Sequence, residues 1–294
     1  MRLLIVSRVL IVGANSFDSG KTHLALQLGK ALLDADCSVD YFKPISGHNY
    51  WYNYNHTKKC LESGQLVSKD ATLIKERLDL KTNLLLMNPV HSLFVPARIE
   101  KPLQQITNSL GLSGSSSVLV MQRFSRPVDG NLDTTMLIAD QLVEDDRLII
   151  GHEEIGKLSH DTSIVDANRL ETFQEFERIH YEECVSKSFS EVEKVKDMVI
   201  IESFNDSTWP WDGLDSVDHV LVVSPGHVFI YNPEKFKKAT YLMNRGNLPI
   251  REVTFGRIAD LLKPTLKFEI KPDSNLTSEQ LKSLDIDCLT GKND

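Results

Sequence analysis

Residues 13–22, Gly-Ala-Asn-Ser-Phe-Asp-Ser-Gly-Lys-Thr, have types and a spacing that suit phosphate chemistry. A loop that ends in Gly-Lys-Thr between a strand and a helix directs backbone N–H groups and the positive end of the helix dipole at one point, where an anion binds well. Gly20 allows close approach to the backbone, Lys21 reaches the β- and γ-phosphates, and the Thr22 hydroxyl is placed to ligate Mg²⁺. The loop therefore predicts a site for a nucleoside triphosphate and its magnesium ion.

The nucleotide contacts are expected from the loop itself. They are Asn15, Ser16, Phe17, Asp18, Ser19, Gly20, Lys21 and Thr22. The loop departs from the standard motif, because six residues rather than four separate Gly13 from Gly20. The sequence has no Asn-Lys-x-Asp segment to accept the N–H groups of a guanine, so ATP is expected rather than GTP. Asn244 would either meet an adenine edge or cap the end of a helix.

Alternating strand and helix patterns surround this loop. Apolar runs predict buried strands at 8–14, 39–42, 117–121, 147–150, 197–201 and 219–223, and a further one at 251–255. Helical spacing predicts helices at 21–33, 71–80, 134–143, 165–187 and 233–243. Parallel neighbours need a crossover connection, so this order favours an α/β fold with a mostly parallel sheet and helices on both of its faces.

The pattern weakens towards the end of the chain. Residues 1–264 are expected to form one nucleotide-binding α/β domain. Residues 265–294 contain Pro272 and end in a polar run, which predicts a loosely attached tail with one short helix at 278–283.

Composition and charge exclude several classes of partner. The chain has 294 residues, with 33 Lys and Arg against 41 Asp and Glu and a formal charge of −8, so we expect neither a nucleic-acid nor an anionic-membrane partner. The apolar run near the N-terminus is interrupted by Arg8 and is too short to span a membrane. These features favour a cytoplasmic protein.

The four cysteines lie far apart and include no Cys-x-x-Cys pair. This arrangement suits reduced thiols better than a disulfide framework. Two His-x-x-x-Cys pairs, at 56–60 and 180–184, would together supply a Cys₂His₂ zinc set. Since buried cysteines are common and the pairs are more than a hundred residues apart, zinc is set aside.

Aligned on Gly-Lys-Thr, the lengthened loop resembles that of dethiobiotin synthetase and its relatives, including the cobyrinic acid diamide synthases. Ala14 then falls on the first glycine of that family's loop and Asp18 on an acidic or small position. Residues 43–47 (KPISG) are similar to the family's K-P-V-x-S-G, and residues 88–96 (NPVHSLFVP) to its N-P-x-x-F-x-x-P. Residues 199–204 (VIIESF) are similar to a strand that ends in V-E-G-A, although the small residues after the glutamate are missing.

The resemblance implies a P-loop NTPase fold that binds Mg·ATP, and it implies roles for single residues. Lys43 and Ser46 would meet phosphate and substrate, and Glu202 would hold Mg²⁺ together with Thr22. A carboxylate that ends an apolar strand of an α/β sheet also points into the ligand crevice. Asp18 would be a further metal ligand or a helix cap.

Two functions from different classes follow. The first is a Mg·ATP-dependent ligase or phosphotransferase in which Lys21 and Lys43 neutralise phosphate charge during transfer to a small-molecule substrate. The second is a nucleotide-dependent switch that controls a protein partner. Homodimers are usual in the resembled family, so a homodimer is a further expectation.

The carboxyl ends of parallel strands share one edge of a sheet, which should bring Lys43 and Ser46 beside Lys21. The aromatic residues at 49–55 follow directly in the sequence. They are expected to line the cleft of the second substrate, or else to pack as an ordinary satellite core.

Overall fold

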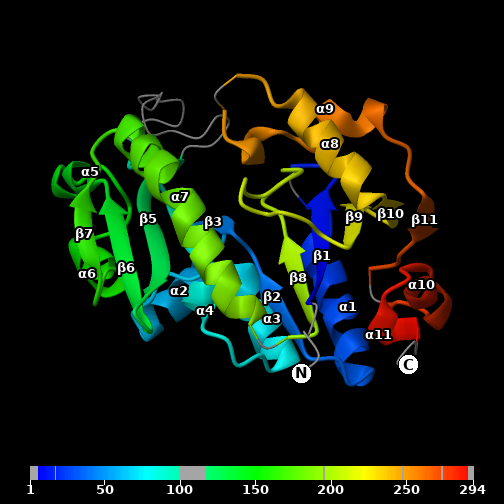
Figure 1. Ribbon diagram of the computed structural model, residues 1–294. Coiled ribbons are helices and arrows are strands. Elements are labelled where there is room, and N and C mark those ends of the chain that lie inside the picture. The colour runs from blue at the N-terminus through cyan, green and yellow to red at the C-terminus, as the bar shows by residue number, and fades with distance from the viewer. Residues whose placement is uncertain are drawn as a thin grey trace. The chain divides into compact units, whose positions relative to one another are not determined.

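The computed structural model describes residues 6–16, 18–99, 117–194, 196–246, 248–272 and 274–290 (Figure 1). It divides the chain into two compact units. Unit 1 consists of residues 1–44, 73–83 and 189–294, and unit 2 of residues 45–72 and 84–188. The segment 1–264, expected as one domain, is thus distributed over both units.

Unit 1 is built on a six-stranded sheet with the order β11-β10-β9-β1-β8-β2. Its strands are β1 (Ser7–Gly13), β2 (Val39–Phe42), β8 (Met198–Glu202), β9 (His219–Ser224), β10 (His227–Tyr231) and β11 (Leu266–Glu269). Strand β1 is parallel to β8 and β9, and β2 is parallel to β8. At the other end of the sheet, β10 is antiparallel to both of its neighbours, β9 and the edge strand β11.

The central strand β1 is buried on both faces, as its continuous apolar sequence predicts for a parallel strand. Helix α1 (Lys21–Asp34) packs against β1, β2 and β8 (Figure 1). Its buried stripe includes Leu24, Leu28 and Leu32. Helix α8 (Pro233–Met243) packs against β9 and α9 (Phe255–Ile258). The remaining short helices are η1 (Ile250–Glu252), η2 (Ala259–Leu261), α10 (Ser278–Ser283) and α11 (Asp287–Thr290).

Unit 2 is built on a five-stranded sheet with the order β3-β4-β5-β6-β7. Its strands are β3 (Ile45–Asn49), β4 (Val90–Pro96), β5 (Ser117–Val128), β6 (Asn131–Ile138) and β7 (Ser163–Asp166). Its helices are α2 (Tyr54–Ser63), α4 (Leu84–Met87), α5 (Asp140–Glu144) and α6 (His152–Leu158). Helices α3 (Lys69–Leu78) and α7 (Leu170–Glu193) each cross a boundary between the units.

The expected α/β class is confirmed, but both sheets are mixed. Strands β3 and β4 are parallel, as are β6 and β7, whereas β5 is antiparallel to β4 and β6. The helix expected at 134–143 is wrong in its first half, where residues 134–138 belong to β6, whereas residues 140–143 are helical in α5. Asp129 and Gly130 both have positive φ and form the two-residue turn of a β5–β6 hairpin, which fixes β6 as a strand.

Two expected strands are also absent from the described structure. The segment 251–255 falls on η1 and the start of α9, and 147–150 forms only an isolated bridge between Leu148 and Ala97. In contrast, β2, α8 and α10 begin and end where their sequence patterns predict. In the part of the chain that the structure describes, no helix is long and apolar enough to cross a membrane.

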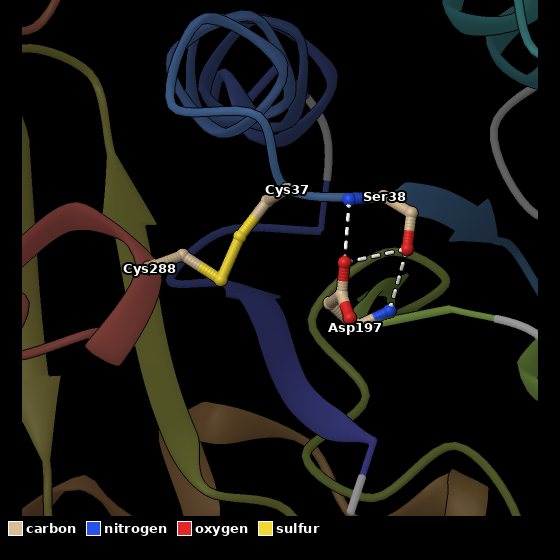
Figure 2. The surroundings of a disulfide bond; sticks show 4 residues. All are labelled: Cys37, Ser38, Asp197 and Cys288. Atoms are coloured by element: carbon tan, nitrogen blue, oxygen red, sulfur yellow. Dashed lines mark hydrogen bonds between the residues drawn. A yellow bond between two sulfur atoms is a disulfide. The ribbon is translucent and has the colours of Figure 1, made fainter. Parts of the chain in front are cut away.

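The C-terminal segment is joined to unit 1 by strand pairing and by a covalent bond. Strand β11 pairs with β10, and Leu284 and Ile286 are buried. Cys37, which follows α1, forms a disulfide with Cys288 of α11 across a Cα–Cα distance of 6.2 Å (Figure 2). The expectation that all cysteines are reduced is therefore wrong for this pair. Cysteines 251 positions apart carry no local signal of their pairing.

Counting thiols tests this arrangement. When the protein is unfolded without reductant and alkylated, we expect two of its four cysteines, Cys60 and Cys184, to react. Mass spectrometry of the alkylated chain gives the count. The variant Cys288→Ser should expose a third thiol by releasing Cys37, whereas Cys184→Ser should leave a single one. Alkylation of all four cysteines before reduction would contradict the disulfide.

Candidate functional site

The phosphate loop continues β1 directly. The Ala14 N–H donates to the Val223 carbonyl at 2.8 Å, which extends the pairing of β1 with β9 into the loop. A Cβ at Gly13 would lie 2.7 Å from the Asn205 carbonyl oxygen and 2.8 Å from that of Asn15, so only glycine fits there. Gly20 is the N-cap of α1 with φ of 91°, a conformation that favours glycine. Packing therefore requires glycine at position 13, and the backbone conformation favours glycine at position 20.

Side chains within the loop hold it in shape. The Ser19 hydroxyl donates to the Asn15 carbonyl at 2.7 Å, and the Ser16 hydroxyl donates to the Asp206 carboxylate at 3.2 Å. Ser19 is buried, whereas Asn15, Ser16 and Asp18 are exposed. Helix α1 starts without a side-chain cap and without an acidic residue in its first turn, so no carboxylate of that turn offsets the positive end of its dipole. Phe17 lies outside the described residues.

The carboxylate of Glu202 is the centre of the site. Its Oε1 accepts hydrogen bonds from the Thr22 hydroxyl at 3.0 Å and from the Lys43 ammonium at 2.7 Å. Its Oε2 accepts one from the Tyr41 hydroxyl at 2.8 Å. Glu202 is 1% exposed and Lys43 is 5% exposed. Three donors from two other segments of the chain therefore converge on one buried carboxylate.

Sheet order explains this convergence. Strand β8 lies between β1 and β2 and is parallel to both, so the carboxyl ends of the three strands share one edge. Glu202 ends β8, Lys43 directly follows β2, and Thr22 lies in the first turn of the helix that follows β1. The structure thus brings together Thr22, Lys43 and Glu202, which the sequence analysis selected from separate segments.

Tyr41 is a member of the site that the sequence analysis missed. It lies within β2, two residues before Lys43, and is fully buried. A buried tyrosine hydroxyl usually has a hydrogen-bond partner. The position of Tyr41 two residues before Lys43 is the sequence signal that could have identified it as part of the site.

The Lys43–Glu202 ion pair is a coupled unit. Burying two charges is costly, and removing one partner leaves the other uncompensated at a cost of about 3–5 kcal/mol. Substitutions of either residue therefore affect folding as well as chemistry.

The oxygens of Thr22 and Glu202 would suit a hydrated magnesium ion. Neighbouring ligands of octahedral Mg²⁺, each about 2.0–2.1 Å from the metal, lie about 2.9 Å apart. The separation of Thr22 Oγ1 and Glu202 Oε1 is 3.0 Å. Mg²⁺ is commonly bound through one or two protein groups, with waters and substrate phosphates completing its shell.

Other possible metal ligands are less well placed. Asp18 has a left-handed backbone with φ of 51° and an exposed side chain. Among the described residues, its carboxylate accepts no capping hydrogen bond from α1 and makes none with Thr22 or Glu202. His56 is bonded to the Val67 carbonyl at 2.8 Å and lies 3.6 Å from Cys60. Within the described ranges, no group of three or more His, Cys, Asp or Glu side chains is arranged to hold a metal ion.

Two buried serines follow Glu202. The hydroxyls of Ser203 and Ser207 have no hydrogen-bond partner among the described residues. Most buried hydroxyls in proteins are paired with protein groups or ordered water. The neighbouring Asn205 carbonyl closes over Gly13, so this segment adjoins the phosphate loop.

Ser46 contacts a different set of residues, all within unit 2. Its hydroxyl lies 2.9 Å from Asn88 Oδ1 and 2.6 Å from His91 Nδ1. The chain continues from His91 Nε2 to His48 Nδ1 at 2.7 Å and from His48 Nε2 to the Thr57 hydroxyl at 3.1 Å. All five side chains are buried. Ser46 is therefore part of a buried polar chain, which the sequence analysis did not foresee.

The aromatic segment after Ser46 is mostly exposed. Tyr50 is buried and its hydroxyl donates to Glu154 at 2.9 Å. Trp51, Tyr52 and Tyr54 are 66%, 78% and 48% exposed. An ordinary satellite core is therefore wrong for these three rings, and their expected role beside a substrate stays a prediction. Asn244 is the C-cap residue of α8.

Comparison with protein-family models, with curated proteins and with solved structures finds no match to this chain. Inferences about its function therefore rest on the geometry of the site.

The buried histidines of unit 2 predict acid sensitivity. Burial lowers the pKa of His48 to about 3, and nearby positive charges on His56 and Lys69 add to this effect. The unfolded chain therefore binds a proton on this side chain more readily than the folded chain does. Acidification below about pH 6.5 then lowers the free energy of unfolding, by up to about 1.4 kcal/mol per pH unit for this group. Chemical denaturation across pH measures the slope.

His48→Gln should flatten this slope between about pH 6.5 and 3. The control His152→Gln, at an exposed site, should keep it. Equal slopes in wild type and the His48 variant would show that His48 is not the responsible group.

Proposed function

We propose that the chain binds Mg·ATP at residues 13–22 and is a ligase or phosphotransferase of the dethiobiotin synthetase type with a P-loop NTPase fold. One observation carries the proposal: the hydroxyl that follows Gly-Lys meets the carboxylate that ends β8 at the spacing of neighbouring magnesium ligands. The lengthened loop and the parallel core of the unit 1 sheet are consistent with it.

Each residue would have a defined role. The loop amides and Lys21 would bind the β- and γ-phosphates, and Thr22 and Glu202 would hold Mg²⁺. Mg²⁺ would neutralise phosphate charge and orient the triphosphate. Lys43 would face the transferred phosphoryl group or an anionic substrate. Catalysis would come mainly from positioning and electrostatic stabilisation.

In this chemistry, the γ-phosphoryl group of ATP passes to a carboxylate or carbamate of the substrate and ADP leaves. A neighbouring nucleophile then attacks the mixed anhydride and releases phosphate. Such an enzyme should turn over ATP slowly until its second substrate is added.

A nucleotide-dependent switch is the second candidate, and the Ser16–Asp206 hydrogen bond favours it. This bond joins the phosphate loop to the segment after Glu202, so nucleotide in the loop would influence both segments. A switch should hydrolyse ATP slowly with or without small molecules, and its partner affinity should depend on the bound nucleotide.

Substitution of Lys21 tests the nucleotide site. Lys21→Ala should raise the Kd of a fluorescent ATP analogue at least ~10-fold, because a charge-assisted phosphate contact contributes about 1.5–3 kcal/mol. The matched control is Lys30→Ala, an exposed lysine of the same helix. Equal affinity of both variants for the analogue would remove the phosphate-loop interpretation.

Substitution of Glu202 tests the metal site. Glu202→Gln keeps the shape of the side chain but removes its charge, so Mg²⁺-dependent nucleotide binding should weaken more than binding in EDTA. Titrations at several Mg²⁺ concentrations separate the two effects. The double variant Glu202→Gln with Lys43→Met controls for the unpaired lysine. An unchanged Mg²⁺ dependence would place the metal elsewhere.

A further inference from the structure

Oε1 of Glu202 is used by two donors. A carboxylate oxygen offers about two lone-pair sites, and this one accepts from Thr22 and from Lys43. A magnesium ion that bridged Thr22 and Glu202 through this oxygen would need one of those sites. It would take the position of the Thr22 hydrogen bond, so the metal and the Lys43 ammonium would be two cations on the same oxygen, and they would repel each other.

The burial of Glu202 explains why a cation lies beside its Oε1. Without a partner, the carboxylate of Glu202 would be an uncompensated charge in a site that is 1% exposed. Lys43, 5% exposed, supplies the compensating charge at 2.7 Å. Either cation would satisfy Glu202, and repulsion between two cations on Oε1 would disfavour their binding together.

We propose that Lys43 and the divalent metal ion compete for Oε1 of Glu202, so that loading of Mg·nucleotide releases the Lys43 ammonium. The inference rests on the proposed function. It gives the site an order of binding, in which the cation that faces an anionic second substrate becomes available only after the metal–nucleotide has bound.

Tyr41 makes this exchange feasible. Its hydroxyl donates to Oε2, whereas the Lys43 ammonium donates to Oε1 at 2.7 Å. The carboxylate therefore keeps one fixed hydrogen bond while the partner of Oε1 changes. Tyr41 acts as a positioning residue for Glu202 in this account.

The competition makes a prediction opposite to that of a simple phosphate contact. If Lys43 only bound phosphate, its removal would leave binding of Mn·ADP unchanged or weaken it. Because it competes with the metal, Lys43→Gln should bind Mn²⁺ at least ~10-fold more tightly at saturating ADP, as measured by electron paramagnetic resonance of free Mn²⁺. Glutamine keeps a hydrogen-bond donor, and Lys30→Gln is the matched control.

A measurement on the wild-type protein avoids any folding defect of the variant. Acetylation of Lys43, read by peptide mass spectrometry relative to exposed Lys30, should be faster with Mg·ADP than with ADP in EDTA. The competition would be overturned if acetylation of Lys43 were unchanged or slower with Mg·ADP. It would also be overturned if Lys43→Gln bound Mn²⁺ no more tightly than the wild-type protein. A wild-type protein that binds no ADP would overturn the proposed function and this inference together, whereas the other results leave nucleotide binding intact.

Discussion

The buried carboxylate of Glu202 constrains the rest of the site. A charge with 1% exposure must be satisfied from inside the protein, and its partners come from the helix after β1 and from β2 and the residue after it. The order β1-β8-β2 at one end of the unit 1 sheet meets that requirement. It also brings a lysine, a threonine and a tyrosine to the end of the phosphate loop.

Unit 2 has its own buried polar interior. Arg123 is buried and donates to the carbonyls of Leu66 and Asn88 and to the Ser125 hydroxyl, and burial lowers its pKa to about 9. Asn88 also accepts from Ser46, which begins the chain of buried histidines. Interior polar groups of this kind stabilise a fold only when they are satisfied together, so they specify the packing of unit 2.

Local patterns predicted the elements that depend on local physics. Helices α1 and α8 follow from helical spacing, and the meeting of Thr22, Lys43 and Glu202 follows from the parallel-strand rule. Pairings between distant segments could not be predicted in this way. The division into two mixed sheets depends on which strands pair, and the disulfide of Cys37 depends on where α11 packs. Tyr41 was missed because its strand was treated only as core.

The central claim is that Glu202 and Thr22 hold a divalent ion beside a nucleotide. A crystal structure of the protein with Mn²⁺ and ADP, with anomalous data at the manganese edge, tests it most directly. The account predicts a manganese peak bonded to Thr22 Oγ1 and to the Glu202 carboxylate, with the Lys43 ammonium no longer hydrogen-bonded to Oε1. Manganese bound away from both residues, or density for nucleotide outside residues 13–22, would contradict the account.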